Sequence, residues 1–322
     1  MSVYTQCSAC PRGCGIDRTK QSAFCGEGSA LRLASACLHF GEEPPVTARG
    51  GSGTIFVTGC NLRCAFCQNY QISQHGMGAA VTGTEFTEIC LRLQELGAEN
   101  INIVTGSHAA PVLAEYLRNA KQTGLSIPVC WNSSGYDSIR SLRLLQSVVD
   151  IWLPDFKTLD RNLARALFAA PDYPQVAQEA IQWMLRHFPL VIEGEKILRG
   201  VIVRHLFLPG QLESTVEALA WLKEHADGKA CISLMSQYTP VPFAEEERLL
   251  AVRNTALSAI ENRLVSAEED TDLRDFICAF DFKHLFYQEL NAGTDWLPDF
   301  ERAQPFSNAL ARPVWHWQTG SL

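Results

Sequence analysis

Short apolar runs alternate with amphipathic stretches through the middle of this chain. Six runs have the length and the β-branched or aromatic content of buried strands, at 54–58, 101–105, 127–131, 149–153, 200–208 and 231–235. Between them, apolar residues recur with a helical period, as in FTEICLRLQELG and APVLAEYLRNAKQTG. Strands that alternate with helices form parallel βαβ units. The pattern therefore predicts an α/β fold of about six units, either a doubly wound sheet or an incomplete α/β barrel.

The two ends of the chain follow different patterns. Residues 1–50 are irregular and end in the turn-forming stretch EEPPVTARGGSG, which indicates a boundary. Residues 241–322 begin with a helical pattern, AEEERLLAVRNTALSAIENRL, and end in an aromatic tail. We therefore predict three parts, 1–50, 51–240 and 241–322. Four aromatic residues of the tail are expected to pack against the main part: Trp296, Phe300, Trp315 and Trp317.

Composition narrows the class of protein. The 322 residues are 47% hydrophobic and 19% charged, which is typical of a globular chain. No run of eighteen apolar residues predicts a membrane span, and the N-terminus lacks an apolar signal core, so we expect a cytoplasmic protein. The net charge of −8 disfavours nonspecific binding to nucleic acid, which requires clustered Lys and Arg.

The chain has twelve cysteines, and eight of them lie in the first 67 residues. Because cytosolic thiols are kept reduced, such clustering indicates metal binding or catalysis rather than disulfides. The four isolated cysteines are expected to be small buried side chains: Cys90, Cys130, Cys231 and Cys278.

Three cysteines follow the first predicted strand with the spacing Cys60-x3-Cys64-x2-Cys67. Ligands bind at the carboxyl ends of strands in parallel α/β folds. Structural zinc sites and electron-transfer clusters normally use four protein ligands, whereas three thiolates leave a position open for chemistry. The alternatives are a disulfide with one free thiol, or a zinc site with a fourth ligand, for which His75 is the nearest histidine.

The triad, with Phe66 before its last cysteine, resembles the signature of the radical S-adenosylmethionine (SAM) superfamily. The stretch GSGTIFVTGCNLRCAFCQNYQIS is similar to the branch of pyruvate formate-lyase activating enzymes, and VDIWLPDFK, VIVRHLFLPG, ISLMSQYTP and WLPDF extend the resemblance over most of the chain. It implies a partial (β/α)6 TIM-like barrel with an N-terminal Cys-rich lobe and a C-terminal helical extension.

The resemblance also implies a mechanism. Cys60, Cys64 and Cys67 would hold a [4Fe-4S] cluster, and one electron would cleave SAM to methionine and a 5′-deoxyadenosyl radical that abstracts hydrogen from the substrate. A flavodoxin or ferredoxin would supply the electron, and the radical would be installed on a glycyl-radical enzyme. Modification of a peptide or small molecule, a noncatalytic metal-binding module and an RNA-modifying enzyme remain alternatives. No further catalytic residue is assigned.

Several residues at strand ends are candidates for binding SAM. Asp155 and Lys157 alternate along an extended segment and can point to one side, where they would hold the zwitterionic end of SAM or a cation, and they resemble the Asp-x-Lys element of activating enzymes; a surface ion pair is the alternative. By resemblance, Arg204 would contact SAM and Phe66 would pack near its adenine. His205 alternates with Arg204 and is expected to pack outside the barrel.

The other strand ends give weaker candidates. Asn132 suits a hydrogen bond to ribose or carboxylate, or an ordinary turn, and stands near the place of an acidic residue in activating enzymes. Gly106 and Ser107 lie where related proteins have Gly-Gly-Glu, although the glutamate is absent. His108 would either contact SAM or substrate, or cap a helix, and Tyr238 is a candidate pocket residue.

The N-terminal segment contains a second set of thiols, Cys7-x2-Cys10-x3-Cys14-x10-Cys25. Four thiolates form a closed site, which fits structural zinc or a second iron–sulfur centre. Unliganded thiols are the alternative, and Cys37 is a spare candidate ligand.

Overall fold

The computed structural model describes residues 3–290, 296–307 and 309–321. The strands are β1 (Arg32–His39), β2 (Ser52–Val57), β3 (Ala79–Ala80), β4 (Ile101–Val104), β5 (Val129–Ser133), β6 (Ile151–Pro154), β7 (Val191–Glu193), β8 (Lys196–Leu206), β9 (Cys231–Met235), β10 (Leu285–Gln288), β11 (Ala311–His316) and β12 (Gly320–Ser321). The helices are α1 (Pro44–Thr47), α2 (Tyr70–Ser73), α3 (Gly83–Glu95), the 3-10 helix η1 (Ser107–Ala109), α4 (Ala110–Thr123), α5 (Ile139–Leu145), α6 (Arg161–Phe168), α7 (Tyr173–His187), α8 (Leu212–Ala226), α9 (Glu247–Leu257) and α10 (Ala267–Phe280).

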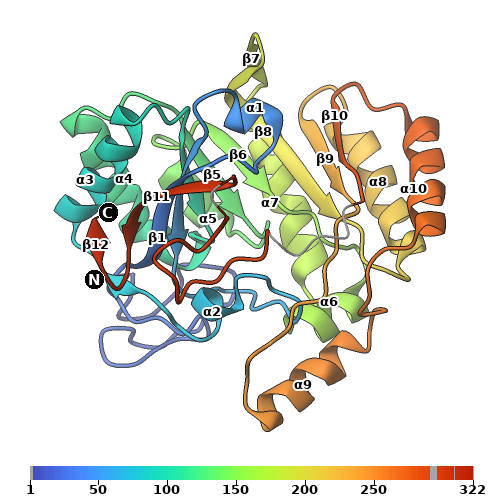
Figure 1. Cartoon of the computed structure of the whole chain (residues 1–322), viewed down its shortest axis with the longest axis horizontal. Helices are drawn as coiled ribbons and strands as arrows, with labels where there is room; N and C mark the ends of the chain where they lie inside the picture. The colour runs from blue at the N-terminus through green and yellow to red at the C-terminus, as the bar shows by residue number, and fades with distance from the viewer. Residues whose placement is uncertain (1–2, 291–295, 308, 322) are drawn as a thin grey trace.

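The central sheet confirms the predicted α/β class. Its order is β10-β9-β8-β6-β5-β4-β2-β1-β11-β12, and the pairs from β2 to β10 are all parallel. The six predicted strands correspond to β2, β4, β5, β6, β8 and β9. The parallel strands follow one another in sequence order without the reversal that a doubly wound sheet requires. With the family comparison below, this supports the partial barrel, with helices such as α3, α4 and α8 outside it (Figure 1).

Side chains alternate between the inside and the outside of the barrel, as the two-residue period of a strand requires. Trp131 and Trp152 belong to the large core cluster that includes residues of the surrounding helices. Their neighbours Cys130 and Leu153 belong to a separate buried cluster with Val46 of α1. The short helix α1 therefore packs against the inward-facing side chains of the barrel.

Local sequence explains where several helices begin. Thr82 accepts a hydrogen bond from the backbone of Glu85, whose side chain bonds back to the backbone of Thr82, which makes a capping box at α3. Ser266 and Glu269 form the same arrangement at α10. Such caps satisfy backbone N–H groups that the first helical turn leaves unpaired.

Both ends of the chain add strands that the sequence analysis did not predict. β1 pairs antiparallel with β2 and with β11, so residues near the two termini complete one sheet. The predicted packing of the tail is confirmed for Phe300 and Trp315, which are buried, and the Trp317 indole donates to Phe300 O at 2.9 Å. The long helix predicted after residue 243 is shorter, covering only α9, and α10 follows after a break. The three-part division of the chain stays a prediction.

The isolated cysteines agree with expectation at three positions and differ at one. Cys90, Cys130 and Cys231 are buried, whereas Cys278 in α10 is exposed, so its predicted burial was wrong. Only two residues of α10, Asp270 and Leu273, are buried, which leaves the position of Cys278 facing solvent. Within the described residues, no helix combines the length and the apolar character needed to cross a membrane.

Candidate functional site

The loop after β2 carries the three predicted cluster ligands. Cys60 and Cys64 are buried and Cys67 is half-buried. The backbone N–H groups of Leu62 and Arg63 donate to the Cys60 sulfur at 3.3 and 3.4 Å. Donors of this kind stabilise the negative charge of a thiolate ligand. The donor set, three clustered thiols on one loop with N–H groups directed at sulfur, fits a [4Fe-4S] cluster with one iron left open.

The electrostatics of these thiols depend on burial and on Lys157. Burial raises the pKa of each of Cys60, Cys64 and Cys67, and the ammonium of Lys157 acts in the opposite direction on all three. Buried thiols remain protonated unless a cation replaces the proton. In the described part of the chain, no three His, Cys, Asp or Glu side chains lie close enough together to hold a single metal ion, so the three thiols are not at the spacing of a zinc site.

The loop after β2 that carries Cys60, Cys64 and Cys67, here called the cluster loop, is held by hydrogen bonds from an N-terminal and a C-terminal arginine. Arg12, in the N-terminal segment, donates to Asn61 O at 2.7 Å and also to two carbonyls at the end of α6. Arg253, in α9, donates to Ala65 O at 2.8 Å and stacks over the Phe243 ring at 3.9 Å. Neither arginine is among the residues predicted from the sequence, because neither lies near the triad in the chain.

Asp155 and Lys157 form a pair beside this loop, as predicted. Lys157 Nζ lies 2.6 Å from Asp155 Oδ2, and both side chains are largely shielded from solvent. Burial opposes the charge on Lys157, but Asp155 and the neighbouring Cys64 and Tyr173 outweigh it and raise the pKa of Lys157. Tyr173, another residue that the sequence analysis missed, donates to Asp155 O and accepts from the Lys157 N–H. The pair is therefore not an exposed surface ion pair, which was the alternative prediction.

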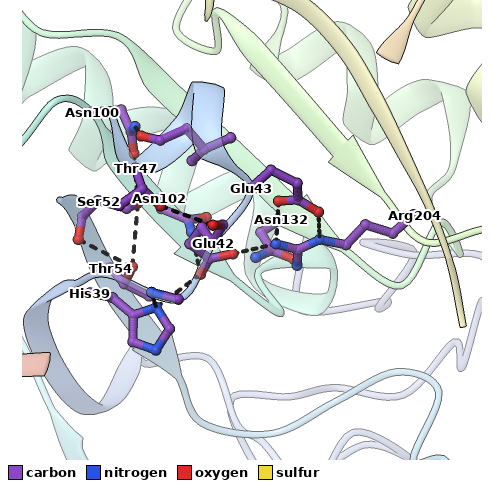
Figure 2. A network of polar contacts seen from close by, with 12 residues as sticks. His39, Glu42, Glu43, Thr47, Ser52, Thr54, Asn100, Asn102, Asn132 and Arg204 are labelled. Atoms are coloured by element: carbon purple, nitrogen blue, oxygen red, sulfur yellow. Dashed lines mark hydrogen bonds and ion pairs between the residues drawn. The ribbon is translucent and has the colours of Figure 1, made fainter. Parts of the chain in front are cut away.

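Arg204 lies inside the barrel, where two carboxylates surround its guanidinium (Figure 2). It binds Glu42, and its Nε lies 2.6 Å from Glu43 Oε1. Its Nη1 is also 3.3 Å from Asn132 Oδ1, so the side chains of Asn132 and Arg204 are partners of each other. The predicted contacts of Arg204 and Asn132 with SAM stay predictions, and the structure gives both side chains protein partners.

The carboxyl ends of β4 and β5 meet at a buried carboxylate that the sequence analysis did not single out. Asp137 accepts a hydrogen bond from Ser133 Oγ at 2.5 Å and another from Ser107. Burial raises the pKa of Asp137, although these hydrogen bonds oppose the shift. Gly106 is packed closely, since a Cβ there would lie 2.6 Å from the Trp131 ring. The only signal for Asp137 in the sequence is its place just after a strand.

Aromatic side chains line one side of the cluster loop. The centroid of the Phe66 ring lies 6.0 Å from the ring centroids of Phe168 and Tyr238, and both contacts are edge to face. Phe66 and the predicted pocket residue Tyr238 are thus brought together. His108 instead lies under the N-terminal segment, where its Nε2 is 2.9 Å from Thr58 O, and it does not cap α4.

The N-terminal cysteines gather beside the cluster loop. Cys7, Cys14 and Cys25 lie within electrostatic range of the Cys10 thiol. Cys37 is elsewhere, in β1, where it packs in an apolar cluster with Phe56 and Phe300. The structure therefore removes Cys37 from the candidate ligands of this group. His75, once the nearest candidate for a fourth zinc ligand at the triad, pairs with Glu245 at 2.8 Å.

His205 confirms the predicted orientation away from Arg204, and it supplies a test of the fold. Its ring bonds to Phe156 O at 2.6 Å and to Thr215 Oγ1 of α8 at 3.0 Å. Burial lowers the pKa of His205 to about 4. Between about pH 6.5 and pH 4, the imidazole of His205 is therefore protonated in the unfolded chain but stays neutral in the folded chain.

We expect the free energy of unfolding to fall through this pH window, by up to about 1.4 kcal/mol per pH unit from this group. Urea denaturation at pH 7 and pH 5 should show a smaller difference for His205→Gln than for the parent. His284→Gln, at an exposed position, is the matched control. An unchanged pH dependence in His205→Gln would contradict a neutral buried imidazole.

Comparison with known proteins gives one family match. The sequence profile of the Radical SAM superfamily matches residues 54–222, a range that includes the cysteine triad. An uncharacterized protein of Methanocaldococcus jannaschii, MJ0674, is 28% identical over 253 residues, which are 76% of this chain and 69% of that protein.

Solved structures show partial similarity. Streptococcus suis SuiB bound to S-adenosylmethionine has a TM-score of 0.47 and 13% identity over 73% of this chain and 48% of SuiB. Methylornithine synthase (PylB) has a TM-score of 0.45 and 14% identity, over 73% of this chain and 62% of its own. A domain of pyruvate-formate lyase-activating enzyme from Bacteroides vulgatus has a TM-score of 0.37 and 10% identity, over 56% of this chain and 92% of that domain's chain. The chain spans about half the length of SuiB.

Proposed function

Because the chain belongs to the radical SAM superfamily, its cofactors are a [4Fe-4S] cluster and S-adenosylmethionine, and we propose that Cys60, Cys64 and Cys67 hold that cluster. When bound, the cluster supplies the electron that cleaves SAM reductively. The observation that carries the assignment is the loop after β2, where the thiols of Cys60 and Cys67 lie within electrostatic range of Cys64 and backbone N–H donors are directed at Cys60. A structural metal site normally closes with four protein ligands, whereas this loop provides three.

The Asp155–Lys157 pair binds the amino-acid end of SAM in this proposal. Its two charges are complementary to the carboxylate and the ammonium of SAM, and the pair lies close enough to Cys64 to influence its thiol. Phe66 and Tyr238 contribute an aromatic wall for the adenine. Gly106 and Ser107 follow β4 at the same edge of the sheet. Asn132, whose Oδ1 accepts from Arg204, and Arg204 itself are further candidate contacts with SAM.

The substrate in this proposal is a partner protein on which a glycyl radical is installed. The path of strands runs from β10 at one end to β12 at the other, and among the described strands no pairing joins these two ends. A barrel left open in this way can admit a loop of another protein to the carboxyl ends of the strands. A one-electron donor such as flavodoxin or ferredoxin completes the system. Modification of a peptide or small molecule uses the same chemistry and is the second candidate.

The experiment tests SAM cleavage first and the identity of the substrate second. The full chain, reconstituted without oxygen, is incubated with SAM and dithionite, and 5′-deoxyadenosine is measured by mass spectrometry. A purified glycyl-radical enzyme from the same genome is then added, and a protein radical is sought by electron paramagnetic resonance. We expect a radical signal that disappears when the partner's radical-bearing glycine is replaced by alanine. Steady 5′-deoxyadenosine formation without any such signal would favour a peptide or small-molecule substrate instead.

A further inference from the structure

We propose that Cys7, Cys10, Cys14 and Cys25 bind a second metal centre through four thiolates, and that this centre holds the cluster loop in place. The shared chemistry is tetrathiolate ligation, which either a zinc ion or an iron–sulfur cluster satisfies. This inference concerns a different set of ligands from the proposed function. It stands whether the substrate is a protein or a small molecule.

The first argument is that the segment has no regular secondary structure and only a small apolar core of its own. No residue from 3 to 31 lies in a helix or strand. Its own apolar cluster contains three buried residues, Tyr4, Cys7 and Ala9. A short segment with so small a core is normally held by a metal or by disulfides, and its cysteines are all free thiols.

The second argument is the pattern of donors around the sulfurs. The backbone N–H of Arg12 is directed at Cys10, and that of Glu27 is directed at Cys25, in both cases two residues after the cysteine. The cluster loop repeats this arrangement, with the Leu62 N–H donating to Cys60. A thiol gains little from such a donor, whereas a thiolate bound to metal is stabilised by it.

A side-chain donor and two glycines complete the arrangement. Arg18 Nη1 lies 3.9 Å from the Cys7 sulfur. Gly15 and Gly26 directly follow Cys14 and Cys25, and both have positive φ, at +67° and +86°. The backbone therefore turns sharply after each of these cysteines, in a conformation that residues with a Cβ rarely adopt. The four thiols are near one another without being at single-ion spacing, so binding of a metal would draw them closer together.

The third argument links this segment to the cluster loop. The Cys60 N–H donates to Cys25 O at 3.2 Å, so a proposed ligand of each centre is joined by one hydrogen bond. Arg12, between Cys10 and Cys14, donates to Asn61 O in the same loop. Loss of the second metal would release both contacts together. The loop after β2 would then become mobile even though its own cysteines are intact.

The experiment isolates the second centre by removing the first. A variant with Cys60, Cys64 and Cys67 all replaced by alanine, in the full chain, is purified without oxygen, and its zinc and iron are measured by mass spectrometry. We expect about one zinc or about four iron atoms per chain to remain. Iron with a visible absorption band identifies a cluster, and colourless stoichiometric zinc identifies the ion; either result supports the proposal. A chain without bound metal would overturn it.

Substitutions then locate the site. In the same background, Cys14→Ser should lose most of the metal, whereas the exposed Cys278→Ser should keep it. Cys14→His keeps a side chain that zinc accepts, so it should recover zinc if zinc is the native metal. Equal metal content in Cys14→Ser and Cys278→Ser would overturn the assignment of ligands.

Hydrogen exchange tests the structural part of the proposal in the chain with its triad intact. Cys14→Ser should accelerate amide exchange in residues 59–68 by at least about tenfold, while exchange in α8 stays unchanged. Unchanged exchange in the loop, in a variant that has lost the metal, would overturn the link between the two centres.

Discussion

Replacement of Cys64 by alanine is expected to lower 5′-deoxyadenosine formation by more than ~100-fold, because a cluster with two protein ligands is not retained. Cys64 is buried, lies between the other two thiols in the chain and is influenced by Lys157. The measurement is product formed per chain with SAM and dithionite, together with iron content after reconstitution. Both should fall together.

The matched control is Cys90→Ala. Cys90 is also fully buried, but it lies in α3 within the apolar core. This variant should keep its iron and its product, apart from a modest loss of stability. Product formation by Cys64→Ala at the parent's rate would contradict the assignment of the triad. Loss in both variants would show that the effect follows from damage to the fold.

Replacement of Arg204 by methionine is expected to destabilise the fold by about 3–5 kcal/mol, because it leaves two buried carboxylates without a cation. The side chains of Glu42 and Glu43 are only 8% and 6% exposed. Burial alone would raise the pKa of Glu43, but Arg204 outweighs burial and holds that pKa below its ordinary value. Urea denaturation at pH 7 measures the change in the free energy of unfolding.

The sign of the pH dependence provides a second check on this ion pair. Since the pKa of Glu43 is lowered in the folded chain, its contribution is present above about pH 4.5 and is lost as the pH falls below that value. Arg204→Met should lose less stability on acidification than the parent does. The control is Arg92→Met, at the exposed Arg92–Glu95 pair, which should cost under about 1 kcal/mol. A similar cost at both arginines would contradict a buried pair.

For Arg204, the sequence predicts the orientation of the side chain but not the residues that it contacts. Its place on the fifth predicted strand and its opposite orientation to His205 follow from strand alternation, and the structure agrees. Its partners do not follow from alternation, since Glu42 and Glu43 reach it from the loop between β1 and α1. A SAM ligand at this position would have to share the guanidinium with both carboxylates.

Asp137 and Tyr173 were missed for a related reason. Each is an ordinary polar or aromatic residue in the chain, without a motif around it. Asp137 becomes notable because it is buried where β4 and β5 end, and Tyr173 because its hydroxyl contacts Asp155 and Lys157. Neither property is visible before the strands are assembled.

The sequence alone determined the six parallel strands, the α/β class and the loop that carries Cys60, Cys64 and Cys67, because each depends on spacing within a few residues along the chain. Only the tertiary structure decided that α1 packs against the inner side chains of the barrel, that β1 joins β2 to β11, and that the N-terminal thiols lie beside the cluster loop. These relations join residues far apart in the chain, such as Arg204 and Glu43, separated by 161 positions. Local periodicity carries no information about such partners, since they are set by how whole elements pack and by which buried charges must be neutralised.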